Sequence, residues 1–299
     1  MILFAFEAYK PMAGALERAT GMLPGRFRTE RFQNGELHIG IQTSVENEDC
    51  FVLGSVAPPD EQLFSALLLA HTLKKERVRR VTAIFPYLAY ARDDKDKPGE
   101  SLATAWTGAL ARASGIDQVI TVDVHSERAR QLFPIPVVSL SPAEVFAGAL
   151  RRYALEEATF VAPDDGALVR CQAVKTAAGL GEGNIAYFKK HRTATGITQI
   201  GPIGEVGRQA LMIDDILDTG GTLLSACEKL REAGVEDISV MVTHGLFTGD
   251  RWRKLWQLGV QRILCTDSVP LPPGVYGNSI VRLAVAPLVE RELCLLAKA

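Results

Sequence analysis

The sequence predicts an α/β protein of two domains, each a mainly parallel β-sheet flanked by helices. First, short runs rich in β-branched residues alternate along the chain with longer runs of helical pattern. Second, the short runs are apolar almost throughout, which is typical of parallel strands covered on both faces. Third, a length of 299 residues leaves room for two domains of about 150 residues each.

The expected strands and helices follow one another in a regular order. Strands are expected at residues 50–56, 79–87, 118–124, 159–163, 184–188, 209–213, 237–244 and 262–266. Helices are expected at residues 62–76, 101–115, 166–180 and 221–234. In the last helix, Leu223, Cys227 and Leu230 fall on one face, and Gly234 is placed to end it.

An internal similarity indicates that the two domains are related. The segment from Cys50 to Tyr87 resembles the segment from Thr159 to Phe188. Each half then contains an apolar strand that ends in acidic residues, QVITVDVHS in the first and QALMIDD in the second. We therefore expect an N-terminal domain over residues 1–142 and a C-terminal domain over residues 143–299, which meet near Ser139–Glu144.

Composition and charge favour a cytoplasmic protein that binds neither nucleic acid nor membranes. A net charge of −2 shows no basic surplus. The five cysteines are scattered and lack CxxC spacing, which favours buried thiols in a reducing compartment over disulfides or zinc. Glu7 comes too early for a signal peptide, and the apolar stretch LFSALLLAHTL is too short to span a bilayer.

The stretch Gln209–Cys227, QALMIDDILDTGGTLLSAC, combines carboxylates with a glycine-rich turn. The glycines of the loop Asp218–Thr222 allow positive φ and close approach of a phosphate to backbone N–H groups, and its threonines add hydroxyl donors. Asp214 and Asp215 would accept hydrogen bonds from a sugar diol or hold a hydrated metal. Phosphorylated ribose is a ligand that satisfies both parts. The alternative is an Asp-rich turn without a ligand.

Polar residues gather where three of the expected strands end. They are Asp123–Ser126, Pro163–Gly166 and Asp214–Asp215. In open parallel sheets, ligands bind beyond the carboxyl ends of the strands. Any one of these groups could be a turn or a helix cap. Their joint occurrence favours a ligand-binding site.

The sequence DDILDTGGTL resembles the phosphoribosyl pyrophosphate loop that type I phosphoribosyltransferases share with ribose-phosphate pyrophosphokinases. Over nearly the whole chain, further segments resemble the ribose-phosphate pyrophosphokinase family: RFQNGELHI, FPYLAYARDDKDKPGE, ITVDVHSERARQLFPIPV, VAPDDGALVRCQA, FKKHR and MVTHGLFTG. The resemblance implies two tandem type I phosphoribosyltransferase-like domains. It also implies an enzyme that transfers the diphosphate of ATP to the 1-hydroxyl of ribose 5-phosphate, with AMP as the second product. The family needs Mg²⁺ and forms homo-oligomers built from dimers, usually hexamers.

The resemblance assigns roles by position. His125 and Asp164 would hold the metal of Mg²⁺–ATP, and Lys190 and Arg192 would supply catalytic cations. The ATP-binding residues would be Phe32, Asn34, Gly35, Glu36, Arg92 and Asp93. The ribose 5-phosphate residues would be Arg192, Asp214, Asp215, Asp218, Thr219, Gly220, Gly221 and Thr222.

Without the resemblance, several of these residues have ordinary interpretations. His125 would be a residue at a helix start, and FKKHR would be a solvated surface run. Asn34–Gly35 fits a hairpin turn, which is compatible with a role in binding ATP. Trp252 and Trp256, one helical turn apart, are expected to be packing residues and not a platform for a ligand.

Two departures from the family pattern keep other functions open. Asp93 stands where the family usually has glutamine, and Ala167 replaces a frequent glycine. One alternative is a non-catalytic regulatory homologue, although the retained basic and metal-binding pairs argue against it. The other is a phosphoribosyltransferase that consumes phosphoribosyl pyrophosphate, which would not need the ATP-binding set of the first half.

Overall fold

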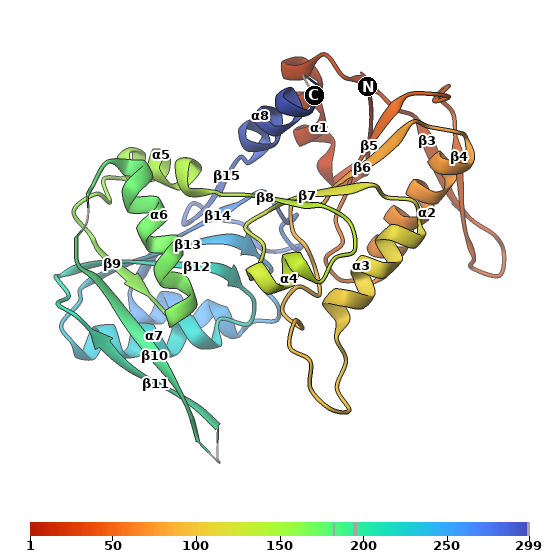
Figure 1. Ribbon diagram of the computed structural model, residues 1–299. Coiled ribbons are helices and arrows are strands. Elements are labelled where there is room, and N and C mark those ends of the chain that lie inside the picture. Colours follow the sequence, from red (N-terminus) through yellow and green to blue (C-terminus); the bar gives the residue numbers. More distant parts are fainter. Residues whose placement is uncertain (182, 194–195, 298–299) are drawn as a thin grey trace. The chain divides into compact units, whose positions relative to one another are not determined.

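The computed structural model describes residues 1–181, 183–193 and 196–297, with the backbone alone for residues 190–193 and 196–198. The chain forms two compact units, each a β-sheet with helices (Figure 1). Unit 1 contains Met1–Ser141 together with the segment from Ala286 onward, and unit 2 contains Pro142–Val285. No helix within the described ranges combines the length and the apolar content needed to cross a membrane.

Unit 1 is built on a parallel sheet with the strand order β2-β1-β5-β6-β7-β8. Its strands are β1 (Ile2–Ala5), β2 (Leu23–Pro24), β5 (Asp49–Leu53), β6 (Arg80–Ile84), β7 (Gln118–Val122) and β8 (Val137–Leu140). A separate antiparallel hairpin joins β3 (Phe27–Arg31) and β4 (Leu37–Ile41). Residues Cys50–Leu53 of β5 are fully buried, as expected for a central strand covered on both faces.

The helices of unit 1 include its C-terminal segment. They are η1 (Glu7–Tyr9), α1 (Lys10–Thr20), α2 (Glu61–Lys75), α3 (Ala103–Ala113), α4 (Glu127–Gln131) and α8 (Ala286–Leu296). Helix α8 packs against α1, and its apolar residues Leu288, Val289 and Leu293 are buried (Figure 1). The expected division at 142/143 therefore differs from the observed units, because the last helix buries its apolar face in unit 1.

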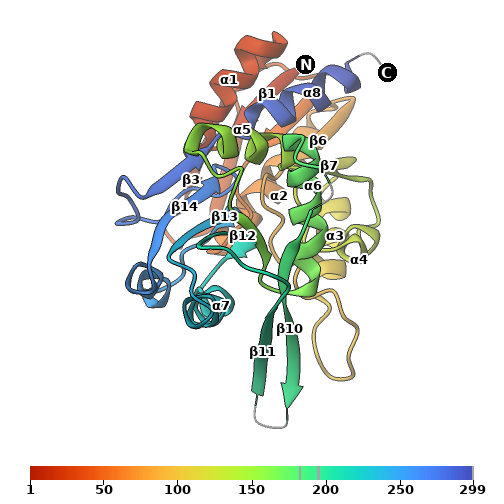
Figure 2. The same ribbon diagram turned by 90° about the vertical axis from the view of Figure 1, so that its left-hand side faces the viewer.

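Unit 2 has a sheet with the strand order β11-β10-β9-β12-β13-β14-β15. Its strands are β9 (Thr159–Ala162), β10 (Ile185–Thr193), β11 (Gly196–Ile203), β12 (Gln209–Leu217), β13 (Asp237–Gly245), β14 (Val260–Thr266) and β15 (Ile280–Leu283). Neighbouring strands are parallel except for β10 and β11, which form an antiparallel ribbon that extends beyond the rest of the sheet (Figure 2).

Helices cover both faces of the unit 2 sheet. They are α5 (Ala143–Tyr153), η2 (Asp165–Ala167), α6 (Leu168–Ala178), α7 (Gly221–Glu232) and η3 (Arg251–Leu258). Met212 of β12 packs in one core cluster with α7 and η3. The next residue, Ile213, packs in a second cluster with α5 and α6. This alternation along one strand places a hydrophobic core on each face of the sheet.

The predicted α/β class with mainly parallel sheets is confirmed. Each expected strand and helix is present, although the ends of several differ. Helix α7 ends at Glu232, and Gly234 follows in the left-handed region with φ of 88°. Five strands were not expected, namely β1, β2, β8, β11 and β15. Four of them are runs of two to four residues, which carry too little periodicity to be recognised, and the sequence of β11 is interrupted by Gly201 and Pro202.

Candidate active site

Two buried acids, Asp214 and Asp215, lie near the carboxyl end of β12. Each residue is 7% exposed, and β12 is a central strand of the unit 2 sheet. The backbone N–H of Asp215 donates a hydrogen bond of 2.9 Å to Oδ1 of Asp214. The carboxyl ends of parallel strands form the usual ligand-binding edge of such a sheet. The two acids are therefore positioned by the sheet itself.

A third acid, Asp164, acts on the same site. It follows β9, the strand beside β12, and its Oδ1 accepts a hydrogen bond of 3.1 Å from the N–H of Ala167. Burial raises the pKa of the Asp214 carboxyl well above its ordinary value, and the charges of Asp215 and Asp164 raise it further. The three acids make a region of negative potential that favours cations and hydroxyl donors.

Arg170 of α6 holds one of these acids. Its Nη2 lies 3.5 Å from Oδ2 of Asp215, and both side chains are largely buried, at 17% and 10% exposure. A buried carboxylate with a guanidinium partner keeps its charge at lower free energy than one without. Arg170 thus compensates the charge of Asp215, while burial, followed by the charges of Asp215 and Asp164, raises the pKa of Asp214.

The loop Asp218–Thr222 carries the chain from β12 into α7. Gly220 is the N-cap of α7 and adopts φ of 82°, in the left-handed region that favours glycine. A Cβ on Gly220 would lie only 3.0 Å from Cα and from Cβ of Trp252. Backbone conformation and packing both require glycine here. The first N–H groups of α7 have no partner within the helix, so this end of α7 is suited to bind an anion.

The remaining loop residues are accessible. Thr219 is exposed, while Asp218, Gly221 and Thr222 are half-buried. The loop therefore offers hydroxyl and backbone N–H groups on one side, and Asp214 and Asp215 precede it on the same strand. This arrangement can bind a ligand that carries both hydroxyls and a phosphate.

The predicted catalytic residues Lys190 and Arg192 lie on β10. In the ribbon, Lys190 pairs with Gln199 of β11 and Arg192 pairs with Ile197. The side chains of both basic residues lie outside the described part of the chain. Nε2 of Gln199 donates a hydrogen bond of 2.8 Å to the carbonyl of Pro163, the residue before Asp164. The backbone of Lys190 is thereby tied to the edge of the sheet that carries Asp164.

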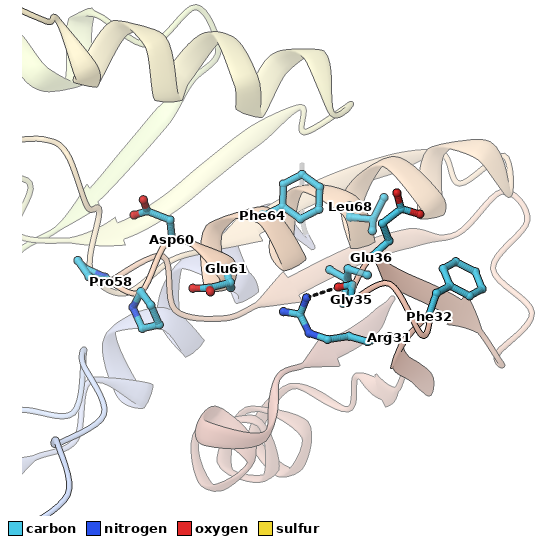
Figure 3. A pocket seen from close by; sticks show the side chains of 11 residues that line it. Arg31, Phe32, Gly35, Glu36, Pro58, Asp60, Glu61, Phe64 and Leu68 are labelled. Carbon is cyan, nitrogen blue, oxygen red and sulfur yellow. Dashed lines mark hydrogen bonds between the residues drawn. The ribbon is translucent and has the colours of Figure 1, made fainter.

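In unit 1, the β3–β4 hairpin carries the predicted ATP-binding residues Phe32, Asn34, Gly35 and Glu36. Oδ1 of Asn34 accepts a hydrogen bond of 3.1 Å from the N–H of Glu36, and Gly35 adopts φ of 89°. Arg31 donates a bond of 2.7 Å to the carbonyl of Gly35 (Figure 3). The hairpin turn that the sequence indicates is confirmed, and these side–backbone bonds give the exposed tip a defined shape.

A groove of about 940 Å³ runs between this hairpin and α2. Figure 3 shows Phe64 and Leu68 of α2 facing it, with Arg31, Gly35 and Glu36 on the hairpin side. Phe32 is also part of the lining and is 57% exposed. The groove combines apolar rings with charged groups, so it is able to accommodate a flat, partly polar molecule.

The predicted nucleotide residues Arg92 and Asp93 follow β6, where Arg92 is exposed. The carboxylate of Asp93 accepts hydrogen bonds from Oγ of Ser101, at 2.6 Å, and from the N–H of Ala103, at 2.9 Å. These bonds lower the pKa of Asp93, the Ser101 hydroxyl having the larger effect. Asp93 therefore closes the loop before α3, a role that the sequence did not suggest.

His125 is exposed in the connection after β7, next to a helix cap. Ser126 is the N-cap of α4, since its Oγ accepts a hydrogen bond of 2.9 Å from the N–H of Ala129. The same hydroxyl donates a bond of 2.5 Å to the buried Asp94. Asp94 thus fixes the backbone that presents His125.

Comparison with known proteins identifies the family. A model of the N-terminal domain of ribose phosphate pyrophosphokinase matches residues 1–115, and a model of the phosphoribosyl synthetase-associated domain matches residues 185–278. The ribose-phosphate pyrophosphokinase of Maricaulis maris is 36% identical over 88% of this chain and 86% of its own length. The chain belongs to the ribose-phosphate pyrophosphokinase family. The namesake enzyme of Bacillus caldolyticus is 30% identical over 97% of this chain and 93% of its own.

A solved member of the family has the same fold. The crystal structure of phosphoribosylpyrophosphate synthetase from Mycobacterium smegmatis superposes with a TM-score of 0.88 at 27% identity. The match covers 99% of this chain and 98% of the other. The predicted two-domain fold of this family is thereby confirmed.

The structure distributes the predicted residues of this family member between its units. The ATP-binding residues and His125 lie in unit 1. Asp164, the basic pair of β10 and the loop Asp218–Thr222 lie in unit 2, where Asp164 is brought to Asp214 and Asp215. Within each unit the predicted residues lie near or after the carboxyl ends of strands, or on a hairpin or ribbon.

Sequence reasoning missed several residues that shape these sites. Arg170, Asp94 and Gln199 each act through a contact with a residue far away in the chain. The position of Arg170 on the predicted helix after PDDG was a usable signal, because that helix begins at the same sheet edge. The partners of Asp94 and Gln199 had no local signal.

The carboxylates of unit 2 are suitable ligands for Mg²⁺, the metal that the resemblance to the family implies. Mg²⁺ prefers oxygen ligands and is commonly held by one or two carboxylates together with waters and substrate phosphates. Among the described residues, no three His, Cys, Asp or Glu side chains form a group able to hold an ion by themselves. Asp164 and the Asp214–Asp215 pair supply carboxylate oxygens, whereas His125 supplies a nitrogen, a less suitable donor.

Proposed function

We propose that this protein transfers the diphosphate of ATP to the 1-hydroxyl of ribose 5-phosphate, giving 5-phosphoribosyl 1-diphosphate and AMP. The observation that carries the proposal is the buried pair Asp214–Asp215 followed at once by the glycine loop that opens α7. Few ligands other than a sugar phosphate need both groups in one connection. Membership of the ribose-phosphate pyrophosphokinase family agrees with this substrate pair.

Ribose 5-phosphate binds in unit 2 under this proposal. Backbone N–H and hydroxyl groups of Asp218–Thr222 receive the phosphate, and the positive end of the α7 dipole adds to the attraction. Asp214 and Asp215 accept hydrogen bonds from ribose hydroxyls, which orients the sugar. Since the nucleophile is the sugar's own hydroxyl, positioning of this kind supplies a large part of the rate enhancement.

Lys190 and Arg192 stabilise the transferred diphosphate. Attack on the β-phosphorus increases negative charge on the equatorial and leaving oxygens, and preorganised cations lower the free energy of that transition state. The location of both residues on the ribbon tied to Pro163 supports this role. A two-stranded ribbon is a suitable carrier of a cation pair because its hydrogen bonds hold their spacing.

ATP is assigned to unit 1, the N-terminal domain. Phe32, Asn34, Gly35 and Glu36 on the hairpin and Arg92 contact the nucleotide, while Asp93 shapes the loop beside them. Arg92 is able to bind a phosphate or to stack on the adenine ring. The groove beside the hairpin supports a nucleotide-binding role.

Mg²⁺ is the metal that we propose for the reaction. Asp164 and His125 would hold it with ATP, and when bound it would neutralise phosphate charge. The burial of Asp214 and Asp215 beside Asp164 supports a site adapted to a nearby cation.

The proposal includes a homo-oligomer and a cellular location. We expect dimers that assemble further, up to a hexamer, with ATP and ribose 5-phosphate as small-molecule partners and without nucleic acid or membrane. The free thiols Cys50, Cys171, Cys227, Cys265 and Cys294 support the reducing cytoplasm as the location. Light scattering on the protein as it elutes from a size-exclusion column measures the number of subunits.

A coupled assay for AMP tests the function. Purified protein is given ATP, ribose 5-phosphate and Mg²⁺, and phosphoribosyl pyrophosphate is identified among the products. Omitting the sugar phosphate is the control for ATP hydrolysis. No AMP above that control with several divalent metals would refute the proposal and favour a regulatory homologue. Consumption of added phosphoribosyl pyrophosphate with a free base would instead indicate a phosphoribosyltransferase.

A further inference from the structure

The guanidinium group of Arg251 lies beside the loop Asp218–Thr222. The place that a Cβ of Gly221 would occupy is 3.7 Å from Nη1 of Arg251 and 3.9 Å from Oγ1 of Thr219. Because Gly221 has no side chain, this place is open, and a cation, a hydroxyl and the first turn of α7 surround it. Arg251 comes from η3, some thirty residues further along the chain.

The position of Arg251 is fixed by its neighbour. Trp252 is 1% exposed and packs on Gly220, while its Nε1 donates a hydrogen bond of 2.9 Å to the carbonyl of Gly249. Its ring also meets that of Phe247, with centroids 4.8 Å apart. The backbone at residue 251 is therefore anchored against the loop, although the Arg251 side chain is exposed.

The charge of Arg251 is available to a ligand. It makes no hydrogen bond or ion pair to another residue in the described part of the chain. The nearest acid in sequence, Asp250, is bound by Arg253 at 3.0 Å, and the guanidinium of Arg253 lies over the Trp252 ring at 4.7 Å. Arg170, the cation on the other side of the site, is paired with Asp215.

A cation at this place offsets the repulsion between a bound phosphate and the acids of the site. A phosphate that reaches the loop also meets the field of Asp214 and Asp215, which repels it. Backbone N–H groups and the helix dipole offer partial charges, whereas a guanidinium offers a full charge and two parallel donors for phosphate oxygens.

We propose that Arg251 binds the 5-phosphate of ribose 5-phosphate and so sets the preference of the site for a phosphorylated sugar. This inference rests on the proposed function. Arg251 acts as a substrate-binding residue: it attracts the phosphate to the loop and offsets the repulsion from the acid pair. It has no part in the transfer of the diphosphate.

Calorimetric titration of ribose 5-phosphate in the absence of ATP tests the inference directly. We expect Arg251→Gln to weaken binding by about tenfold, the loss typical of one charged hydrogen bond. Arg251→Lys should restore part of the affinity, since it keeps the charge. Arg253→Gln is the matched control, because it removes a guanidinium from the same helix that is already paired with Asp250.

A second readout separates binding of the phosphate from a structural effect. The second pKa of a phosphate ester is about 6, so wild-type affinity should fall as the pH drops through about 6. Arg251→Gln should show a smaller fall, because it lacks the charge that distinguishes dianion from monoanion. In steady-state assays its KM for ribose 5-phosphate should rise while its KM for ATP stays unchanged.

The outcomes distinguish this inference from the proposed function. If the wild type forms AMP and Arg251→Gln binds ribose 5-phosphate as tightly as the wild type, Arg251 is only a solvated arginine and the inference is wrong. If Arg253→Gln loses as much affinity as Arg251→Gln, the effect is structural and the inference is also wrong. If the wild type neither binds ribose 5-phosphate nor forms AMP, the proposed function fails, and this inference fails with it.

Discussion

Asp214 and Asp215 are joined by a hydrogen bond of 2.9 Å from the backbone N–H of Asp215 to the carboxylate of Asp214. The two acids are adjacent in sequence and buried to the same extent, which is unfavourable in a site without a cation. Arg170 compensates Asp215, and the raised pKa of Asp214 reflects its burial first and then the repulsion from Asp215 and Asp164. Such a pair is stabilised when a ligand supplies hydroxyl donors or a cation.

Replacing Asp214 should change how stability depends on pH. Its folded-state pKa lies above the ordinary value of 3.8, so the protonated group favours folding at low pH, and this contribution is lost as the pH rises through the folded pKa. We expect the free energy of unfolding of Asp214→Asn to decrease less than that of the wild type from about pH 4 to about pH 9. Urea unfolding of both proteins at each pH measures the free energy of unfolding.

The control for this prediction is Asp237→Asn, which removes an exposed acid at the opposite end of the neighbouring strand β13. It should retain the wild-type pH profile. Asp214→Asn should also lose most AMP formation, since a donor amide nitrogen replaces one of the two acceptor oxygens available to the sugar hydroxyls. Identical pH profiles for Asp214→Asn and the wild type would show that Asp214 titrates normally.

Gly220→Ala should be more destabilising than Gly234→Ala, although both glycines flank α7 and both adopt the left-handed backbone conformation. Gly234 follows α7 with φ of 88° and open space around it, so Gly234→Ala should cost about 1 kcal/mol for the backbone alone. Gly220 has a similar φ of 82°, but a Cβ there also meets Trp252 at 3.0 Å. Urea unfolding of both variants isolates the contact with Trp252. Equal losses would mean that Trp252 moves away freely.

Lys190→Ala should lower the rate of AMP formation by about a hundredfold to a thousandfold, as for the loss of one transition-state charge contact. The fold should be intact, because the residue lies on the projecting ribbon. Lys189→Ala is the control: Lys189 is exposed and its ammonium lies 5.8 Å from the centre of the Tyr187 ring. Turnover of Lys190→Ala near the wild-type level would show that FKKHR is a solvated surface.

Asp93→Ala should loosen the loop between Asp93 and α3. The Asp93 carboxylate holds Ser101 and Ala103, and its lowered pKa means that these bonds persist at neutral pH and weaken as the pH falls through the folded pKa. We expect faster tryptic cleavage after Lys95 and a higher KM for ATP. Asp96→Ala, in the same loop, should leave the KM for ATP at the wild-type value. An unchanged cleavage rate in Asp93→Ala would contradict this.

The chain by itself determined the α/β class, the order of most elements and the chemistry of the loop Asp218–Thr222. These features are local, because each is encoded by residues close together in the sequence. They are the hydrophobic period, a pair of acids and a glycine that must adopt positive φ. The hairpin turn at Asn34 and Gly35 was equally local. So was the packing role of Trp252, which is 1% exposed and whose ring centroid lies 6.4 Å from that of Trp256.

Only the tertiary structure decided which groups act together. Asp164 reaches Asp214 because β9 and β12 are neighbours in the sheet, although fifty residues separate them. Arg170 forms an ion pair with Asp215. Arg251 lies beside the loop Asp218–Thr222 because Trp252 packs on Gly220. Helix α8 joins unit 1 for the same kind of reason. Parallel strands that are adjacent in space are distant in sequence, so a side chain's charge partner is set by sheet order and packing, which no local pattern encodes.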